Sequence, residues 1–180
     1  MFDRDTFRAL RKKSPGDPVL AYDATHFRFL AREALSYGVG IVGLKAGTRG
    51  MYLATGDEAR LRTFGRAKPG PEFARREFWQ PAFKVAEVKS ATGAGDNAIA
   101  GFLAAFLHGM GPVRCLHVAA MAGADNVKEL DATSGIRSWE ATIADIPRQT
   151  PVDVHAGREF AFDAKDALWR GSCDGAGVEG

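Results

Sequence analysis

Cysteine is scarce in this sequence: there are two in 180 residues, Cys115 and Cys173, too far apart to suggest a metal-binding pair. This excludes a disulfide-stabilised miniprotein and favours a reducing compartment. No apolar run approaches the roughly 18 to 20 residues that span a bilayer. The N-terminal segment MFDRDTFRALRKK lacks the apolar core of a signal peptide. We therefore expect a cytoplasmic protein that makes no use of a membrane.

An excess of charge of one sign is also lacking. Lys and Arg number 24 against 22 for Asp and Glu, which gives a net charge of +2. This balance offers no electrostatic case for binding nucleic acid or an anionic membrane. The four histidines show no ligand spacing, so no metal site is predicted. With 46% hydrophobic and 26% charged residues, a mainly disordered chain is excluded too.

Glycine is the residue in excess, at 21 of 180, where about 7% is typical. No internal repeat or long linker divides the chain, so we predict one domain over residues 1–180. Residues 147–180 are interpreted as a C-terminal extension with a flexible, glycine-rich end.

Apolar periodicity predicts alternating helices and strands. The predicted helices cover residues 2–13, a segment from an N-cap at Thr25 to Gly38, 98–107, 112–130 and a segment from Ser138. The predicted strands are 39–44, 51–54, 60–64 and 83–88, with a surface connection at 65–81 and a hairpin at 159–170. Because residues 39–44 are apolar without alternation, they indicate a strand buried on both faces of a parallel sheet. We therefore expect an α/β fold with a mainly parallel sheet.

The segment Thr92-Gly93-Ala94-Gly95-Asp96 carries the clearest chemical signal. Glycines allow a tight turn and close approach of a ligand. A helix that starts there directs unpaired amides and a positive dipole end at an anion such as phosphate. Asp96 would then suit a general base that accepts a proton from an attacking hydroxyl. The residues alone are equally compatible with a tight turn at the end of a strand in which Asp96 only caps the helix.

A resemblance strengthens the first interpretation. SATGAGDNAIAGFLAAFLHG resembles the C-terminal signature of the ribokinase-like carbohydrate kinases, the PfkB family. Upstream, GVGIVGLKAGTRGMYL resembles that family's strand and TLGxxG turn. Downstream, Asp131–Ile136 resembles the loop before its last helix. All three occur in the family's order, so the resemblance covers most of residues 25–146.

The resemblance implies a ribokinase-like three-layer α/β/α sandwich, of which this chain holds the C-terminal half. It implies a kinase that uses ATP and Mg²⁺ to phosphorylate a hydroxyl of a sugar or nucleoside. In this reading Asp96 matches the general base, and Gly93, Ala94 and Gly95, with the Asp96 amide, match the anion hole. The residues that match the nucleotide-binding positions are Lys45, Gly47, Thr48, Gly50 and Thr92. The turn at 45–50 and residues 92–96 should form two walls of one phosphate cleft.

The sequence also departs from the family pattern. Ser90 replaces the usual Asp or Asn, which puts a monovalent-cation site in doubt, and Ala98 replaces a usual Phe. The one Asn-x-x-Glu segment, Asn126–Glu129, follows the Gly93 segment, whereas the family's segment that organises Mg²⁺ precedes it, so it lies in the wrong place for that role. The alternative is therefore a catalytically incomplete nucleotide-binding remnant or interaction module that needs a separate N-terminal half. Without that half, an apolar sheet edge would be unpaired, which would favour self-association or a complementary partner.

Overall fold

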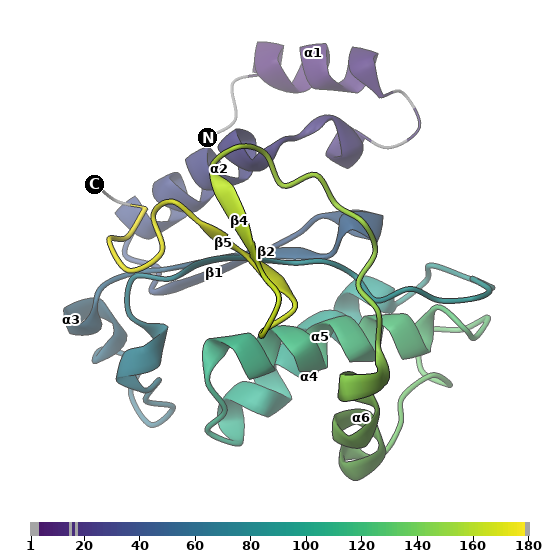
Figure 1. The fold of residues 1–180 in the computed structure, drawn as a ribbon. Helices are drawn as coiled ribbons and strands as arrows, with labels where there is room; N and C mark the ends of the chain where they lie inside the picture. The colour runs from purple at the N-terminus through teal and green to yellow at the C-terminus, as the bar shows by residue number, and fades with distance from the viewer. Residues whose placement is uncertain (1–3, 15, 17, 179–180) are drawn as a thin grey trace. The chain divides into compact units, whose positions relative to one another are not determined.

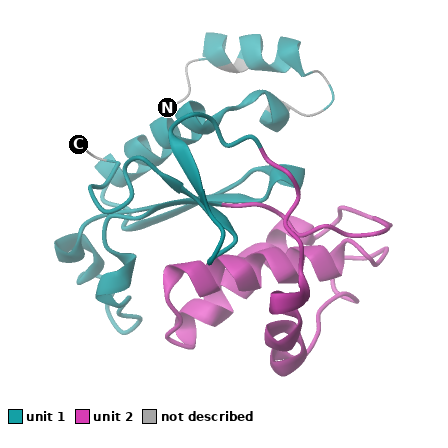
Figure 2. Cartoon of the chain, viewed as in Figure 1, with its two compact units in different colours: residues 1–79, 155–180 teal, residues 80–154 magenta. Residues whose placement is uncertain are grey.

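The computed structural model describes residues 4–14, 16 and 18–178. These residues form two compact units (Figure 2). Unit 1 contains residues up to Trp79 together with those from His155 onward, and unit 2 contains Gln80–Val154. The interpretation of residues 1–180 as one domain stays a prediction, and each unit is described here by itself.

Unit 1 holds a five-stranded sheet and the helices of the N-terminal segment (Figure 1). Its helical elements are α1 (Arg4–Lys13), η1 (Pro18–Ala21), α2 (Ala24–Ser36), η2 (Gly47–Arg49), α3 (Glu58–Leu61) and η3 (Pro71–Phe73). Its strands are β1 (Ile41–Lys45), β2 (Met51–Thr55), β3 (Glu77–Gln80), β4 (Phe160–Asp163) and β5 (Leu168–Gly171), with Gln80 of β3 assigned to unit 2.

The sheet has the order β1-β2-β3-β5-β4, and the pairs β1/β2, β3/β5 and β4/β5 are antiparallel. The expectation of a mainly parallel sheet was therefore wrong. Only residues 46–50 join β1 to β2, whereas a parallel pair needs a crossover of a dozen residues or more. Gly43 and Lys45 of β1 are also exposed, so this strand is not buried on both faces.

The core of unit 1 is aromatic. All five residues of β2 are buried, and α2 packs against β1 and β2 with Phe27, Ala31 and Leu35 buried. The Phe27 and Trp79 rings meet edge to face with centroids 5.0 Å apart, and the Tyr52 and Trp79 centroids are 6.2 Å apart. Such pairs stabilise a core beyond the area that they bury.

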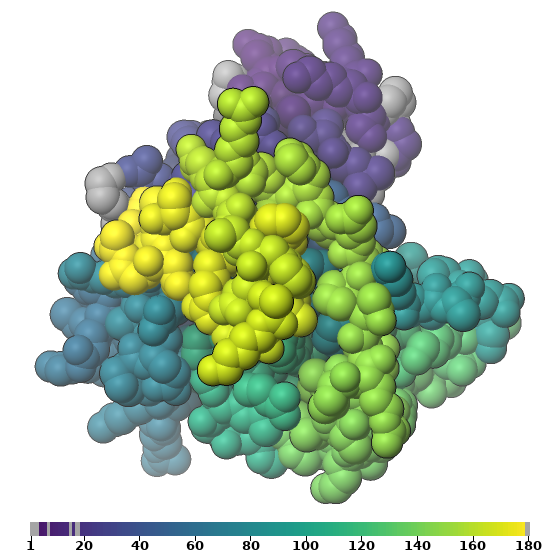
Figure 3. Space-filling model, viewed as in Figure 1, coloured from purple at the N-terminus to yellow at the C-terminus, as the bar shows by residue number. Residues whose placement is uncertain are grey.

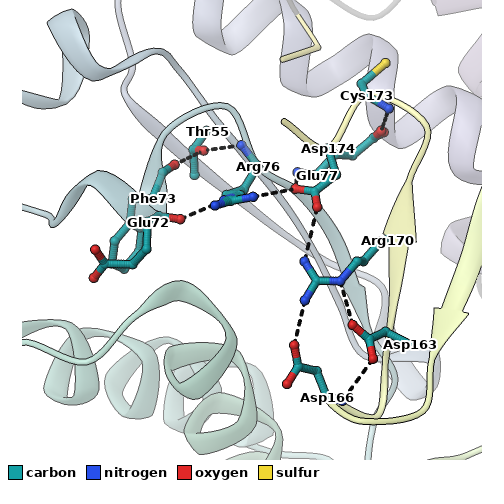
Figure 4. Close-up of polar contacts among 10 residues, drawn as sticks. All are labelled: Thr55, Glu72, Phe73, Arg76, Glu77, Asp163, Asp166, Arg170, Cys173 and Asp174. Atoms are coloured by element: carbon teal, nitrogen blue, oxygen red, sulfur yellow. Dashed lines mark hydrogen bonds and ion pairs between the residues drawn. The ribbon is translucent and has the colours of Figure 1, made fainter. Parts of the chain in front are cut away.

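The predicted hairpin at 159–170 is confirmed by β4 and β5. Arg170 of β5 donates to three carboxylates, those of Asp163, Asp166 and Asp174, at 2.7, 2.6 and 3.1 Å (Figure 4). In the space-filling view, the hairpin and the residues after it form a continuous yellow surface (Figure 3). Val178 is buried in the described part of the glycine-rich end, and residues 179–180 lie outside the described part.

Three local predictions in this part of the chain were wrong. The expected strand at 60–64 is replaced by α3, because Asp57 caps that helix by accepting from the Arg60 amide at 2.9 Å. The expected surface connection at 65–81 ends in the fully buried strand β3. Residues 83–88 form only one bridge, between Phe83 and Pro151. Consequently no strand runs directly into the Gly93 turn.

Unit 2 consists of α4 (Ala94–Leu107), α5 (Pro112–Asn126), α6 (Trp139–Asp145) and η4 (Ile146–Arg148). The predicted helices in this part of the sequence are thereby confirmed, with Ser138 as the N-cap of α6. The helix predicted at 112–130, however, ends at Asn126. Helix α2 is confirmed as well, although its N-cap is Asp23 and not Thr25. Of the predicted helix at 2–13, residues 4–13 form α1 and residues 2–3 lie outside the described residues.

Helices α4 and α5 approach closely because Gly101 has no side chain. A Cβ there would lie 2.9 Å from the Val118 carbonyl oxygen and 3.0 Å from the Ala122 Cβ. Within the described residues, no helix is both long and apolar enough to cross a membrane.

Candidate functional site

The Gly93 turn lies at the N-terminus of α4, a helix of 14 residues. Gly93 is the N-cap and has a left-handed backbone with φ +78°. A Cβ at this position would also lie 2.7 Å from the Ala132 Cα, so the turn requires glycine for both its conformation and its space. Residues 93–96 are therefore at a helix start, as the motif predicted, and not in the middle of a helix.

The first turn of α4 directs its backbone amides toward the space before the helix. The Ala94 amide donates to the Ala91 carbonyl at 3.3 Å, and the Asn97 amide donates to Gly93 at 2.8 Å. Gly95 and Asp96 lie between them, and the Asp96 side chain is exposed. Thr92 is exposed too, and its amide donates to Ser90 Oγ at 3.1 Å. A partly positive helix end beside an exposed carboxylate can bind an anion and accept a proton.

Asn97 fixes this turn to the loop that precedes α6. It is 8% exposed, and its Nδ2 donates to the carbonyl oxygens of Gly93 at 2.9 Å and Ala132 at 2.8 Å. The sequence interpretation missed Asn97. The signal was present, because a polar amide within the first turn of an otherwise apolar helix usually has a specific hydrogen-bonding role when it is buried.

The loop that contacts Gly93 is itself ordered by Asp131. The Asp131 carboxylate accepts hydrogen bonds from the amides of Thr133 and Ser134, each at 2.7 Å, and from the Ser134 hydroxyl at 2.6 Å. The bond from the Ser134 hydroxyl and those from the two amides lower the pKa of Asp131 well below its usual value. The carboxylate is therefore ionised at neutral pH and fixes the conformation of the loop over residues 131–134.

Gly135 closes the same loop against α5, and its replacement gives a first prediction. A Cβ at Gly135 would lie 2.4 Å from the Asn126 Cα and 2.7 Å from the Asp125 carbonyl oxygen, both of them backbone atoms that cannot easily move. We expect Gly135→Ala to lower the free energy of unfolding by about 1–3 kcal/mol, measured by urea denaturation.

Gly123→Ala is the matched control for this prediction. Gly123 lies within α5, and a Cβ there would make only ordinary contacts with α4, at 3.5 Å from the Ala94 carbonyl oxygen and 3.7 Å from the Ala98 Cβ. Alanine also favours the helix by up to about 1 kcal/mol, so this variant should be as stable as the parent or more so. A Gly135→Ala variant that matches Gly123→Ala in stability would show that the loop does not pack as described.

A cavity of about 250 Å³ also lies in unit 2. It is lined by residues of α4, α5, α6 and the loop before α6, among them Ala104, Ala122 and Trp139. None of residues 92–96 lines it. Asn97, which follows this segment and bonds to the Gly93 carbonyl, does line the cavity.

The second predicted segment, residues 45–50, lies in unit 1. It forms a tight turn in which the Ala46 amide donates to Gly50 at 2.7 Å and the Gly50 amide donates to Gly47 at 3.1 Å. Gly47 and Gly50 have positive φ values of 59° and 97°. Lys45, Gly47 and Thr48 are exposed, whereas Ala46 is buried. One side of the turn is therefore available to a ligand.

The two predicted walls of the phosphate cleft thus lie in different units. Each has the local conformation that the sequence predicted, a glycine-dependent turn with exposed residues. Their meeting in one cleft stays a prediction.

Comparison with known proteins decides the family. The model of the pfkB family of carbohydrate kinases matches residues 30–139, more than half of the chain, including both turns and the Asp131 loop. The chain belongs to the pfkB family. No curated protein matches it.

Among solved structures, this pfkB-family chain is similar to a protein described as a "putative sugar kinase from Clostridium perfringens". The TM-score is 0.57 at 15% sequence identity, and the likeness covers 72% of this chain and 35% of the other. The chain therefore has a partial ribokinase-like fold and spans about a third of the length of that kinase.

Proposed function

We propose that this chain carries the phosphoryl-transfer side of an ATP-dependent carbohydrate or nucleoside kinase. The observation that supports this most strongly is the left-handed Gly93 turn at the start of α4, with Asp96 exposed in its first turn. The family match includes this segment. In the proposed reaction, the γ-phosphoryl group of ATP passes to a hydroxyl of the acceptor.

Asp96 is the proposed general base. Its carboxylate would orient the attacking hydroxyl and accept its proton as the new P–O bond forms. The backbone amides of the segment Gly93, Ala94, Gly95 and Asp96 would stabilise the charge on the transferring group. The Ala94 amide already donates a hydrogen bond to the Ala91 carbonyl. We therefore expect a substitution at Gly95 to reduce nucleotide binding most.

The nucleotide phosphates would lie along both glycine turns. Lys45, Gly47, Thr48 and Gly50 are the proposed contacts in unit 1, and Thr92 is the proposed contact in unit 2. ATP supplies the phosphoryl group, and Mg²⁺ would accompany it as the counter-ion of its phosphates. The described residues contain no group of three or more His, Cys, Asp or Glu arranged to hold a metal.

Nucleotide binding gives the direct test of this proposal. A Val side chain at Gly95 would occupy the space that phosphate must approach. One or two charge-assisted hydrogen bonds between the backbone amides and the phosphate would then be lost. We expect Gly95→Val to weaken the binding of ATP with Mg²⁺ by about tenfold or more, measured by isothermal titration calorimetry.

Gly16→Val is the matched control, because a Cβ at Gly16 would meet nothing within 4 Å. It should bind ATP as the parent chain does. Equal binding by the parent chain and Gly95→Val would remove the assignment of the phosphate site.

The second candidate function is a nucleotide-binding module that is inactive until the rest of a kinase is supplied. The coverage of only 35% of the similar kinase favours it. The surface of α4 favours it as well, since Ile99, Leu103 and Leu107 are 42%, 51% and 72% exposed. Their spacing places them on the helix face that also carries Asp96. A part of the kinase fold that covered this stripe, from the same polypeptide or another, would lie beside the proposed base.

The two candidates differ in sugar-dependent ADP release. A kinase complete in this chain would release ADP when an acceptor sugar is added. A nucleotide-binding module would release it only when the remaining part of the fold is present, in cis or as a separate chain.

A further inference from the structure

We infer that Arg49 is a positioning residue that holds the 45–50 turn in the conformation that binds the nucleotide phosphates. The inference rests on the proposed function, because it assigns a role within the same site. Arg49 lies between the two glycines of the turn, and none of the predicted nucleotide contacts includes it.

The Arg49 side chain points into unit 1, away from the exposed side of its own turn. Its guanidinium carbon lies 5.3 Å from the centroid of the Trp79 ring and 5.8 Å from that of Phe27. Both rings are almost fully buried, at 1% and 3% exposed. A guanidinium within about 6 Å of a ring face is attracted by the ring electrons. The Arg49 Nη2 also donates to the Val19 carbonyl at 2.6 Å, which ties the turn to η1.

The backbone of Arg49 is held from the same direction. The Trp79 indole Nε1 donates to the Arg49 carbonyl oxygen at 2.9 Å. The Arg49 amide donates to Ala46 at 3.1 Å, within the turn. Side chain and backbone of one residue are thus fixed to Trp79 of β3, Phe27 of α2 and Val19 of η1, three residues of unit 1.

This anchoring has a consequence for the exposed side of the turn. Gly47 and Gly50 are conformationally free residues, and a turn that contains both loses much entropy when it is ordered. With Arg49 fixed inward, the backbone beside Lys45, Gly47 and Thr48 is ordered before a ligand arrives. Ordering in advance raises affinity, because the ligand does not have to supply that free energy.

Lysine could not replace arginine in this role. The guanidinium is planar, so it can face aromatic rings while an edge N–H donates to a carbonyl. An ammonium group is compact and more strongly hydrated, and it would leave the rings for water. If the turn then occupied its binding conformation a tenth of the time, the apparent dissociation constant for ATP would rise about tenfold.

The test compares Arg49→Lys with the parent chain by two measurements made well below the unfolding temperature. Hydrogen exchange of the Ala46, Arg49 and Gly50 amides reports the order of the turn without nucleotide. Calorimetric titration with ATP and Mg²⁺ reports affinity. We expect faster exchange at these amides and ATP binding about tenfold weaker. If Arg49→Lys does not fold, Arg49→Met replaces it in the test, because methionine fills the space over the rings without a charge or a hydrogen-bond donor. It should likewise give faster amide exchange and weaker ATP binding.

Arg62→Lys is the control, since the Arg62 side chain is 75% exposed in the same unit. It should change neither measurement. Unchanged exchange in Arg49→Lys would overturn the inference, and so would faster exchange with unchanged ATP affinity. A role in stability alone would lower the unfolding temperature and leave ATP affinity unchanged. If the parent chain binds no ATP, the proposed function fails and the inference falls with it.

Discussion

Replacement of Asp96 by asparagine is expected to reduce sugar-dependent ADP release by a factor of about 10²–10⁴, with ATP affinity nearly unchanged. Asparagine has the same shape and leaves the Gly93 turn and the first amides of α4 in place. It cannot accept a proton from the attacking hydroxyl. The loss should therefore appear in kcat and not in the binding of the nucleotide.

The assay is coupled ADP release over a panel of sugars and nucleosides, with the chain alone and with the remaining part of the kinase fold. We expect the chain alone to be a weak kinase or inactive, because it spans only about a third of the length of the similar kinase. Asp153→Asn, at an exposed aspartate of the same unit, is the control and should retain full turnover. Turnover that survives in Asp96→Asn would show that the base is wrongly assigned.

Glu77→Gln should have the largest effect on stability. The Glu77 carboxylate is fully buried in unit 1. It accepts hydrogen bonds from two nitrogens of the Arg28 guanidinium, Nε at 2.7 Å and Nη2 at 2.9 Å. It also accepts from the Tyr52 hydroxyl at 2.9 Å and from the Cys173 amide at 3.0 Å. Burial, followed by the charge of Glu77, raises the pKa of Tyr52, so its hydroxyl remains a donor.

Loss of one charge of a buried ion pair leaves the other without compensation. We expect Glu77→Gln to lower the free energy of unfolding by about 3 kcal/mol, at the lower end of the roughly 3–5 kcal/mol range for such changes. The glutamine carbonyl oxygen can still accept hydrogen bonds, which is why the lower end applies. The measurement is urea denaturation followed by tryptophan fluorescence.

Glu159→Gln is the matched control, because Glu159 pairs with the same Arg28 while its side chain is 56% exposed. An exposed pair contributes less than about 1 kcal/mol. The buried variant should therefore be much less stable than the exposed one. Equal losses would mean that burial of Glu77 does not determine the strength of the pair.

The conformation of the two glycine turns was more predictable than the sheet. The Gly93 turn and α4 follow from local features, two closely spaced glycines and a single apolar stripe, which need no distant partner. The roles proposed for Asp96 and for the 45–50 turn rest on resemblance to a family, because spacing alone was equally compatible with Asp96 as a capping residue.

The sheet was predicted less well because apolar patterns report burial and not strand direction. The run at 39–44 indicated a buried strand, but only the short link to β2 fixes the pair as antiparallel. The strand EFWQ at 77–80 was hidden by its polar ends, since Glu77 becomes acceptable in a core only when Arg28, far away in the sequence, pairs with it. Contacts of this kind arise from tertiary structure, and no local pattern contains them.

The central proposal is that the 45–50 turn of unit 1 and the Gly93 turn of unit 2 are both nucleotide-binding positions. Backbone amide NMR of the chain titrated with ATP and Mg²⁺ tests it most directly. We predict that the amide signals of residues 46–50 and 94–96 shift together, along one binding curve. Shifts confined to one turn, shifts centred on the cavity beside Trp139, or no shifts at all would contradict the claim.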